Sequence, residues 1–222
     1  MSTSATLSTR VGDLVAHEVS PTWGREKATL LGGSGAIVVA TVLGRILVGA
    51  ASAAAKTGGN TGNGAFTLDA TTPVLAGARP GVYTVRCITA AANGGVFRVE
   101  DPDGLVMGDV AVGSTFADDL KFTIADGAAD FIVGDGWDIT VAEGSGKVVP
   151  LSLTARDGSQ IADSIALEAK ASSASDQDLE ILARGAVVNS SQLVWPAGAT
   201  DAQKASALST LKRLGIVARA SI

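Results

Sequence analysis

The middle of the chain alternates apolar and polar residues in the way that is typical of β-strands with one buried face. Six segments carry this pattern: 65–69, 81–88, 96–100, 120–124, 129–133 and 137–141. Turn-forming sequences lie between them, among them Asn93-Gly94-Gly95 and Asp135-Gly136. Six short strands at this spacing predict a small β-sandwich or barrel.

Strand-like sequence also flanks this middle part. Residues 36–46 are almost continuously aliphatic, which predicts a strand buried on both faces, and residues 25–31 precede it across a glycine loop at 32–35. No Lys-Ser or Lys-Thr pair and no helix follows that loop, so it predicts a turn and not a nucleotide site. Further strands are expected in the apolar segments 160–171, 179–184, 185–189 and 193–195.

A helix is predicted near the C-terminus. Thr200 is the expected N-cap, with Gln203 at the capping-box spacing and Gly215 where a left-handed residue would end the helix. Its apolar face is predicted from residues spaced by three: Ala202, Ala205, Leu208 and Leu211. Residues 216–218 then predict a terminal strand.

Two stretches of small, turn-forming residues, 56–64 and 143–146, mark changes of pattern along the chain. They predict that residues 57–146 form a β module inserted into a domain made of residues 1–56 and 147–222, since insertions succeed at exposed loop tips. Residues 1–10 are rich in Ser and Thr without apolar periodicity, and a flexible N-terminal arm is expected to extend to about residue 19.

Composition narrows the classes of function. The 222 residues are 46% hydrophobic and 18% charged with 27 glycines, which indicates a globular, turn-rich chain. A net charge of −5 argues against nucleic acid as a partner. No apolar run is long enough to span a membrane and no secretory signal pattern begins the chain. The single cysteine, Cys87, is compatible with synthesis in a reducing cytoplasm.

No constellation of residues predicts catalysis, a cofactor or a metal site. The only histidine, His17, lies in the expected arm, and Cys87 on an alternating strand is better explained as a buried small residue than as a nucleophile. Asp101, Asp103 and Asp109 resemble half a calcium loop but lack its terminal glutamate, so a surface turn is expected.

Two features could point to carbohydrate chemistry. Glu100-Asp101 and Asp118-Asp119 are adjacent carboxylates of the kind that glycosidases use, but such neighbours on exposed loops are usually solvated. Trp23, Trp137 and Trp195 could include a sugar-stacking platform. For Trp137 the expected place is the core of the β module.

The C-terminal sequence nevertheless resembles a known family. Val194-Trp195-Pro196, the capped helix, Gly215 and the terminal strand together are similar to the C-terminal part of the head decoration proteins of lambda-like tailed bacteriophages. The run Val42-Leu43-Gly44-Arg45-Ile46 resembles the same family, as does the order of the strands expected in residues 1–56 and 147–222. The resemblance covers these two segments only, because the smallest members lack the β module.

The resemblance implies a mainly β fold with a short C-terminal helix, and a function without catalysis. Such proteins are homotrimers that bind the outer surface of the expanded capsid at three-fold positions and stabilise it against internal DNA pressure. The expected partners are therefore the lattice of the major capsid protein and two further copies of this chain. The expected location is the outer surface of the virion, after synthesis in the host cytoplasm.

The resemblance also suggests site residues. In the family the N-terminal arm pairs with the capsid lattice, a role that would fall on Leu14, Val15, His17 and Val19. Disorder, or a strand of the protein's own sheet, is the alternative for this segment. Trp195 and Pro196 are expected at the trimer or capsid contact.

The β module has two open interpretations. It would project outward, where it could bind surface glycans or serve as inert bulk. The competing hypothesis for the whole chain is a free-standing β-rich adhesin or carbohydrate-binding protein, which would be a monomer.

Overall fold

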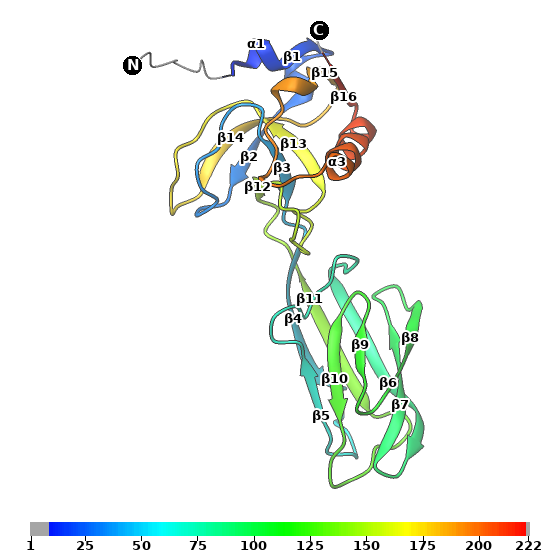
Figure 1. Ribbon diagram of the computed structural model, residues 1–222. Helices are drawn as coiled ribbons and strands as arrows, with labels where there is room; N and C mark the ends of the chain where they lie inside the picture. Colours follow the sequence, from blue (N-terminus) through cyan, green and yellow to red (C-terminus); the bar gives the residue numbers. More distant parts are fainter. Residues whose placement is uncertain (1–8, 221–222) are drawn as a thin grey trace. The chain divides into compact units, whose positions relative to one another are not determined.

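The computed structural model describes residues 9–220 and divides the chain into two units (Figure 1). The discontinuous unit holds residues 1–46 and 146–222, and the inserted unit holds residues 47–145. The apolar cores divide in the same way: one buried cluster draws all its members from residues 48–141, and the other two draw theirs from residues up to 43 and from 148 onward. Each unit therefore has a core of its own.

The N-terminal boundary of the inserted unit lies earlier in the chain than the sequence predicted. Strand β4 (Val48–Ala55) pairs along its length with β11 (Gly136–Glu143), a strand of the inserted unit. The small side chains of this alanine-rich segment carry little apolar signal, which is why the sequence favoured the other domain for it. The pairing with β11 assigns it to the inserted unit, which therefore begins at Leu47 and not at Thr57.

A closed five-stranded barrel forms the centre of the discontinuous unit. Its strands run in the order β12 (Val148–Pro150), β2 (Arg25–Leu30), β14 (Gln177–Leu182), β13 (Ala162–Ala166) and β3 (Val42–Arg45). The side chains of Leu30, Leu43, Leu179 and Ile181 fill one side of this unit's core. Gly44 is required in β3 because a Cβ there would overlap the backbone of Ser159.

The strand expected over residues 36–46 is much shorter than the apolar run. Ala40 adopts a left-handed conformation with φ 75°, which ends any regular strand on its N-terminal side. Ile37 and Thr41 form only isolated bridges, to Lys170 and Val194. The apolar sequence correctly predicted burial, since Ile37, Ala40 and Val42 are buried. It did not predict the length of the strand.

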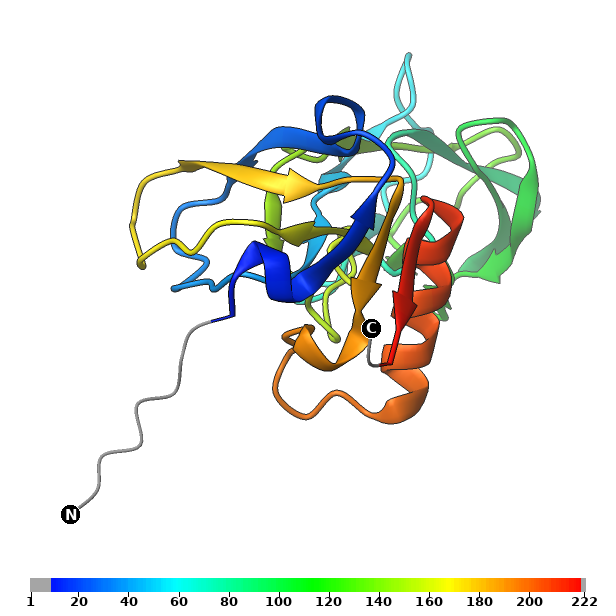
Figure 2. The same cartoon turned by 90° about the horizontal axis from the view of Figure 1, so that it is seen from above.

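A three-stranded sheet lies beside the barrel, in the order β1 (Val15–Glu18), β15 (Ala186–Asn189) and β16 (Ile216–Arg219). β15 and β16 are parallel, so the chain must cross over between them, and it does so through η1 (Ser190–Gln192) and α3 (Asp201–Arg213). Figure 2 shows α3 lying alongside β16. Two single-turn helices, α1 (Val11–Leu14) and α2 (Pro21–Gly24), flank β1.

The capping of α3 agrees with the sequence, whereas its buried face does not. The N–H of Gln203 donates to Thr200 Oγ1 and the N–H of Thr200 donates to Gln203 Oε1, at 3.3 and 2.9 Å, and Gly215 has φ 81°. Ala207 and Leu211 are the buried residues, while Ala202 and Ala205 are exposed. Residues spaced by three drift about 60° per step around a helix of 3.6 residues per turn, so the predicted set could not remain on one face.

The inserted unit is a β-sandwich. Its larger sheet has the order β4, β11, β6 (Gly81–Ala91), β7 (Gly94–Glu100) and β8 (Val106–Ala111), and its smaller sheet has the order β5 (Ala65–Leu68), β10 (Lys121–Ala125) and β9 (Thr115–Ala117). The two sheets pack face to face around a core rich in aromatic rings (Figure 1). The rings of Phe97, Phe131 and Trp137 pack edge to face or tilted, with centroids 5.1 to 5.6 Å apart.

Residues 129–133, expected as a strand, form a loop. Only Phe131 turns into the core, where it is 1% exposed, while Ile132 and Val133 are exposed. Gly62 and Gly64 lie against Phe131 so closely that a Cβ on either would overlap it. The alternation over five residues thus reflected one buried anchor and not a paired strand. Among residues 9–220, no helix is long and apolar enough to cross a membrane.

The buried carboxylate of Asp135 connects the loop at residues 61–62 of the inserted unit to the loop that contains Ile132. Asp135 is 2% exposed and accepts hydrogen bonds from the N–H groups of Thr61, Gly62 and Ile132, at 2.9, 2.9 and 3.1 Å. Burial acts to raise its pKa, but the three N–H groups outweigh burial and hold the pKa of Asp135 below its usual value. The ionised carboxylate is therefore the form that the fold favours.

Asp135→Ala should lower the stability of the inserted unit by about 3 kcal/mol, because three N–H groups lose their acceptor. Since the folded-state pKa is depressed, the contribution of Asp135 is present above the unfolded pKa of about 3.9 and is lost as the pH falls through the folded value. Urea unfolding at pH 7 and at pH 3 measures both effects. The mutant should lose less stability between these pH values than the wild type, and an equal loss in both would contradict this role.

The opposite result is expected for Ser164 in the barrel. Its side chain is fully buried, and among the described residues Ser164 Oγ is the one buried side-chain polar atom without a hydrogen-bond partner. Removing such a group removes its desolvation cost. Ser164→Ala should therefore leave the melting temperature unchanged or raise it by a few degrees. Ser159→Ala is the contrasting control, because Ser159 Oγ donates to Asp157 Oδ1 at 2.6 Å and its loss should lower the melting temperature.

Candidate functional site

The N-terminal segment that was expected to reach a partner is in part folded into the discontinuous unit. Leu14 is 0% exposed in the core, and Val15 packs beside it. β1 pairs antiparallel with β15, which is the own-sheet alternative that the sequence left open. Within this segment His17 and Val19 remain exposed, and residues 1–8 of the expected arm lie outside the described residues.

Trp195 and Pro196 are both half-buried. Trp195 packs against the core cluster that contains Leu193 and Leu211, so much of its surface is used within the chain. Val194, next to it, is more exposed, and its backbone bridges to Thr41. Trp195 therefore helps to build the core of this unit, and only part of the Trp195 and Pro196 rings is left exposed for contact with a partner.

The exposed ring of Trp23 is a feature whose position the sequence did not indicate. The ring is carried by α2 and is 52% exposed. It lies on the backbone of Gly185, which has φ 65° and where a Cβ would overlap the indole ring. The Arg184 guanidinium lies 5.7 Å from the ring centroid and donates to the Trp23 carbonyl at 2.9 Å. The ring is thus held in place while remaining accessible.

We call the surface around this ring the Trp23 face. It is a groove of about 440 Å³ lined by Trp23, Glu26, Arg45, Asp163, Ala183, Arg184 and Leu214. Its charges are paired within it, Arg184 with Glu26 and Arg45 with Asp163. Two positive and two negative side chains leave the face formally neutral, with Trp23 and Leu214 as its exposed apolar part.

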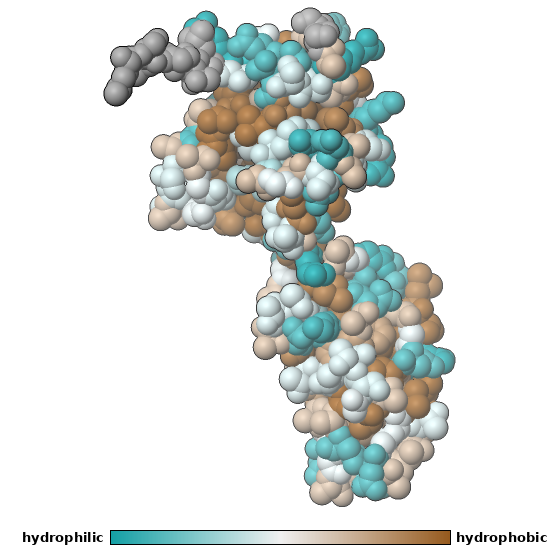
Figure 3. Space-filling model, in the orientation of Figure 1, coloured by the Kyte–Doolittle hydropathy of each residue, from teal (hydrophilic) through white to brown (hydrophobic). Residues whose placement is uncertain are grey.

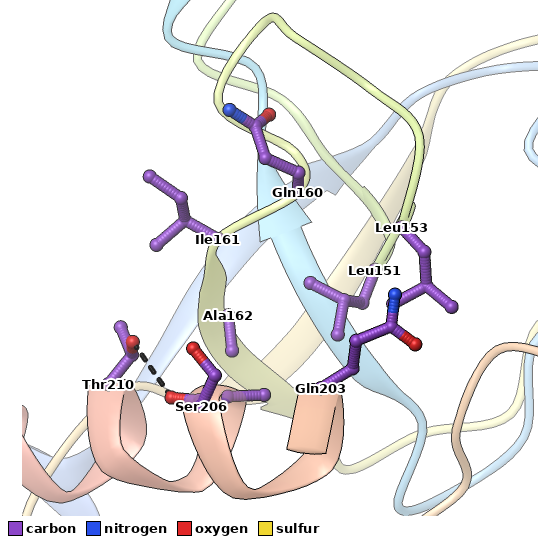
Figure 4. A pocket seen from close by; sticks show the side chains of 9 residues that line it. Leu151, Leu153, Gln160, Ile161, Ala162, Gln203, Ser206 and Thr210 are labelled. Carbon is purple, nitrogen blue, oxygen red and sulfur yellow. Dashed lines mark hydrogen bonds between the residues drawn. The ribbon is translucent and has the colours of Figure 1, made fainter. Parts of the chain in front are cut away.

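A second groove runs beside the first turns of α3 (Figure 4). We call it the α3 groove; it measures about 220 Å³ and is lined by Leu151, Leu153, Gln160, Ile161, Ala162, Gln203, Ser206, Ala207 and Thr210. Figure 4 shows the helix residues on one side and the leucines and Ile161 on the others. The Thr210 hydroxyl donates to the Ser206 carbonyl at 3.2 Å, and no lining residue carries a charge.

Exposed apolar side chains are not confined to these grooves. Figure 3 shows apolar surface on both units. In the described part of the discontinuous unit the large exposed apolar residues are Val19, Trp23, Val38, Ile161, Val194 and Leu214. The inserted unit carries a similar set: Leu47, Val82, Leu105, Val106, Ile132 and Val133. Scattered apolar residues of this kind are normal on a protein surface and do not by themselves mark an interface.

The residues considered for chemistry are placed where they have structural roles. Cys87 is buried, and burial raises the pKa of its thiol, which keeps it protonated. Asp101 accepts from the N–H groups of Asp103 and Leu105, as in a surface turn, and pairs with Arg79. Asp109 pairs with Arg98. Among residues 9–220 no group of His, Cys, Asp or Glu side chains is arranged to hold a metal ion.

The inserted unit offers no aromatic platform in the part of the chain described. Tyr83, Phe97, Phe122, Phe131 and Trp137 are all buried, and the remaining two rings pack against the same core. Sugar binding by stacking requires an exposed ring face. Trp137 is thus a core residue, as expected from the sequence.

Charge is distributed unevenly between the units. The inserted unit contains 5 Lys and Arg residues against 12 Asp and Glu residues, whereas the discontinuous unit contains 12 against 10. The formal charges are therefore −7 and +2, which together give the −5 of the whole chain. The acidity belongs to the inserted unit alone.

The sequence matches the family of the bacteriophage lambda head decoration protein D over residues 5–216. The chain belongs to this family. The match extends through the inserted unit as well as the discontinuous one, so the resemblance seen in the C-terminal residues holds for nearly the whole chain. A mainly β fold with a short C-terminal helix and an inserted sandwich is the form that this member of the decoration family takes.

Comparison with curated protein sequences found no significant match. Two crystal structures of FlgL from Xanthomonas campestris are 22% identical, with TM-scores of 0.31 and 0.30, and cover 49% of this chain. The match spans about a third of the FlgL chains, 34% and 33%. A likeness at this level carries no argument about the function of this decoration protein.

The support of Trp23 by glycine can be tested directly. Gly185→Ala should destabilise the discontinuous unit by about 2–4 kcal/mol, because it strains a left-handed residue and displaces the ring. Gly33→Ala is the matched control, with φ 82° and no atom within 4 Å of an added Cβ, and it should cost about 1 kcal/mol. Urea unfolding and acrylamide quenching of tryptophan fluorescence measure the difference. Equal effects of the two substitutions would show that the ring does not depend on Gly185.

Proposed function

We propose that this protein binds as a homotrimer to the outer surface of the expanded capsid, at three-fold positions, and stabilises the shell against the pressure of packaged DNA. Membership of the head decoration family carries this proposal. Its partners are then the lattice of the major capsid protein and two further copies of the chain. Catalysis has no part in it, because binding alone performs the function.

The physical basis of stabilisation is linkage. A protein that binds the expanded shell, and not its precursor or free subunits, lowers the free energy of the expanded state by RT ln(1 + [L]/Kd). This amounts to about 2.7 kcal/mol per site at a hundredfold excess over Kd. In a trimer, three capsid contacts act together, so each single contact can be weak while release of the whole trimer is slow.

The N-terminal region supplies the capsid contact in this proposal. His17 and Val19 are the exposed members of the predicted set. Among residues 9–220, β1 has a paired strand on one side only, so its other edge could accept an added strand. Leu14 and Val15 would support the contact from within the core. Trp195 and Pro196 add their exposed portions to a trimer or capsid contact.

The inserted unit is proposed to be a passenger that projects from the shell. Its core is separate from that of the discontinuous unit. The two residues of the discontinuous unit that flank the insertion, Ile46 and Gly146, are neighbours in space: the N–H of Gly146 donates to the carbonyl of Ile46 at 2.9 Å. Recognition of surface glycans by this unit gains no support from its buried aromatic rings, and an adhesin function for the whole chain has no observation in its favour.

The first test compares two states of the capsid. Purified protein should bind expanded heads and should not bind unexpanded heads, and bound heads should withstand a higher temperature before they release DNA. Cosedimentation and light scattering measure binding and release. Equal binding to both kinds of head would contradict the linkage mechanism, and no binding to expanded heads would remove the proposed function.

The second test removes the inserted unit. Replacing residues 47–145 by Asn-Gly places two residues between Ile46 and Gly146, whose backbone bond then closes a β-turn. We expect the shortened protein to fold and to bind expanded heads within about threefold of the full chain, since no residue of its core is lost. Loss of head binding by a folded variant, as judged by circular dichroism, would show that the inserted unit takes part in attachment.

A further inference from the structure

The inserted unit carries an excess of negative charge that its own cations do not balance. Its formal charge is −7, whereas that of the discontinuous unit is +2. We propose that this charge gives the inserted unit a function of its own: it keeps decorated heads apart, because the units displayed on one head repel those on another. The inference rests on the proposed attachment to the capsid and adds a role that attachment itself does not require.

Most positive side chains of the inserted unit are held by carboxylates of the same unit. Four of its five cations form such ion pairs: Arg79 with Asp101 and Asp103, Arg86 with Asp138, Arg98 with Asp109, and Lys121 with Asp69. A second unit that approaches therefore meets few cations that could pair with its own carboxylates. The excess negative charge then decides the sign of the long-range force between the two units, and that force is repulsive.

The remaining exposed carboxylates are spread over the surface of the unit. Asp118 lies in the connection between β9 and β10, Asp126 and Asp130 follow β10, and Glu143 ends β11. Within the described part of the chain, none of these four belongs to an ion pair, and no set of carboxylates is arranged to hold a metal ion. Charge of one sign that is distributed in this way acts as a field around the whole unit.

The inserted unit also has an edge strand through which copies could associate. In the part of the chain that the structure describes, β8 has a paired strand on one side only. Val106 at its start is 57% exposed, and Leu105 directly before it is 65% exposed. An edge of this kind can pair with a strand of another copy, and the many copies on a head would multiply even a weak attraction. Repulsion between the units opposes their approach before such short-range contacts form.

The dependence on salt distinguishes repulsion by charge from separation by bulk. Charges act over about 8 Å at physiological ionic strength, but only over about 3 Å at about 1 M salt. Repulsion by charge should therefore fade as salt is added, whereas the volume that the unit occupies does not depend on salt. The two explanations can be separated by changing charge at constant shape.

A neutralised variant replaces the four exposed carboxylates by amides of the same shape: Asp118→Asn, Asp126→Asn, Asp130→Asn and Glu143→Gln. The formal charge of the unit changes from −7 to −3, and an amide at position 130 keeps the oxygen that accepts from the N–H of Asn93. The variant should bind expanded heads as the wild type does, because all four positions belong to the inserted unit. At about 0.15 M salt, dynamic light scattering should show single heads with the wild type and aggregated heads with the variant.

A recharged variant is the matched control. It adds four carboxylates to the neutralised protein at other exposed positions of the same unit: Thr57→Asp, Ala92→Asp, Ser114→Asp and Ala128→Asp. Heads that carry it should again remain single, because the formal charge returns to −7. The differences between the three proteins should disappear at about 1 M salt. Circular dichroism and gel densitometry confirm that each variant is folded and that the heads carry equal amounts.

The outcomes separate this inference from the proposed function. Neutralised heads that stay single, or recharged heads that aggregate, would overturn the role of net charge and leave the decoration function standing. Wild-type protein that does not bind expanded heads would remove the decoration function. Repulsion is then still tested on the free proteins by static light scattering at about 0.01 M salt, where charges act over about 30 Å. The second virial coefficient should be positive for the wild-type and recharged proteins and clearly lower for the neutralised one; equal values would overturn the repulsion.

Discussion

The fold depends on the pairing of β3 with two strands that follow it only after the inserted unit. β3 ends at Arg45, yet it is hydrogen-bonded to β12 and β13, which begin at Val148 and Ala162. These ladders close the barrel and bring the two halves of the discontinuous unit together. Because the long intervening segment has a core of its own and leaves and returns at neighbouring residues, closing the barrel does not require that segment to be ordered against it.

The two units also differ in charge and in the exposure of their aromatic rings. On the discontinuous unit, the exposed side chains of Trp23 and Leu214 lie among paired charges. The inserted unit carries the acidity of the chain and keeps its aromatic rings inside. Because each unit has a core of its own, the sequence of either unit could change without loss of the other's core.

A few glycines are essential to the packing of the discontinuous unit. Many of the 27 glycines simply form turns, but a few permit contacts that no other residue would allow. Gly44 lets β3 pass against the backbone of Ser159, and Gly185 supports the ring of Trp23. At such positions the need for glycine comes from a segment that is distant in the sequence, so it cannot be predicted until that neighbouring segment is known.

The sequence by itself determined those features that depend only on residues close together in the chain. The capping box at Thr200 and Gln203, the left-handed Gly215 and the alternation of β6, β7 and β11 were all evident from local spacing, as was the family resemblance of the C-terminal residues. Burial and pairing across long separations were decided only by the tertiary structure. The alanines of β4 carry no strand signal and are ordered by β11, Leu14 is buried because β15 offers an edge to β1, and Phe131 anchors a loop because glycines 62 and 64 make room for it. Local rules do not specify which distant segment completes a sheet or a core, because that choice belongs to the packing of the whole unit.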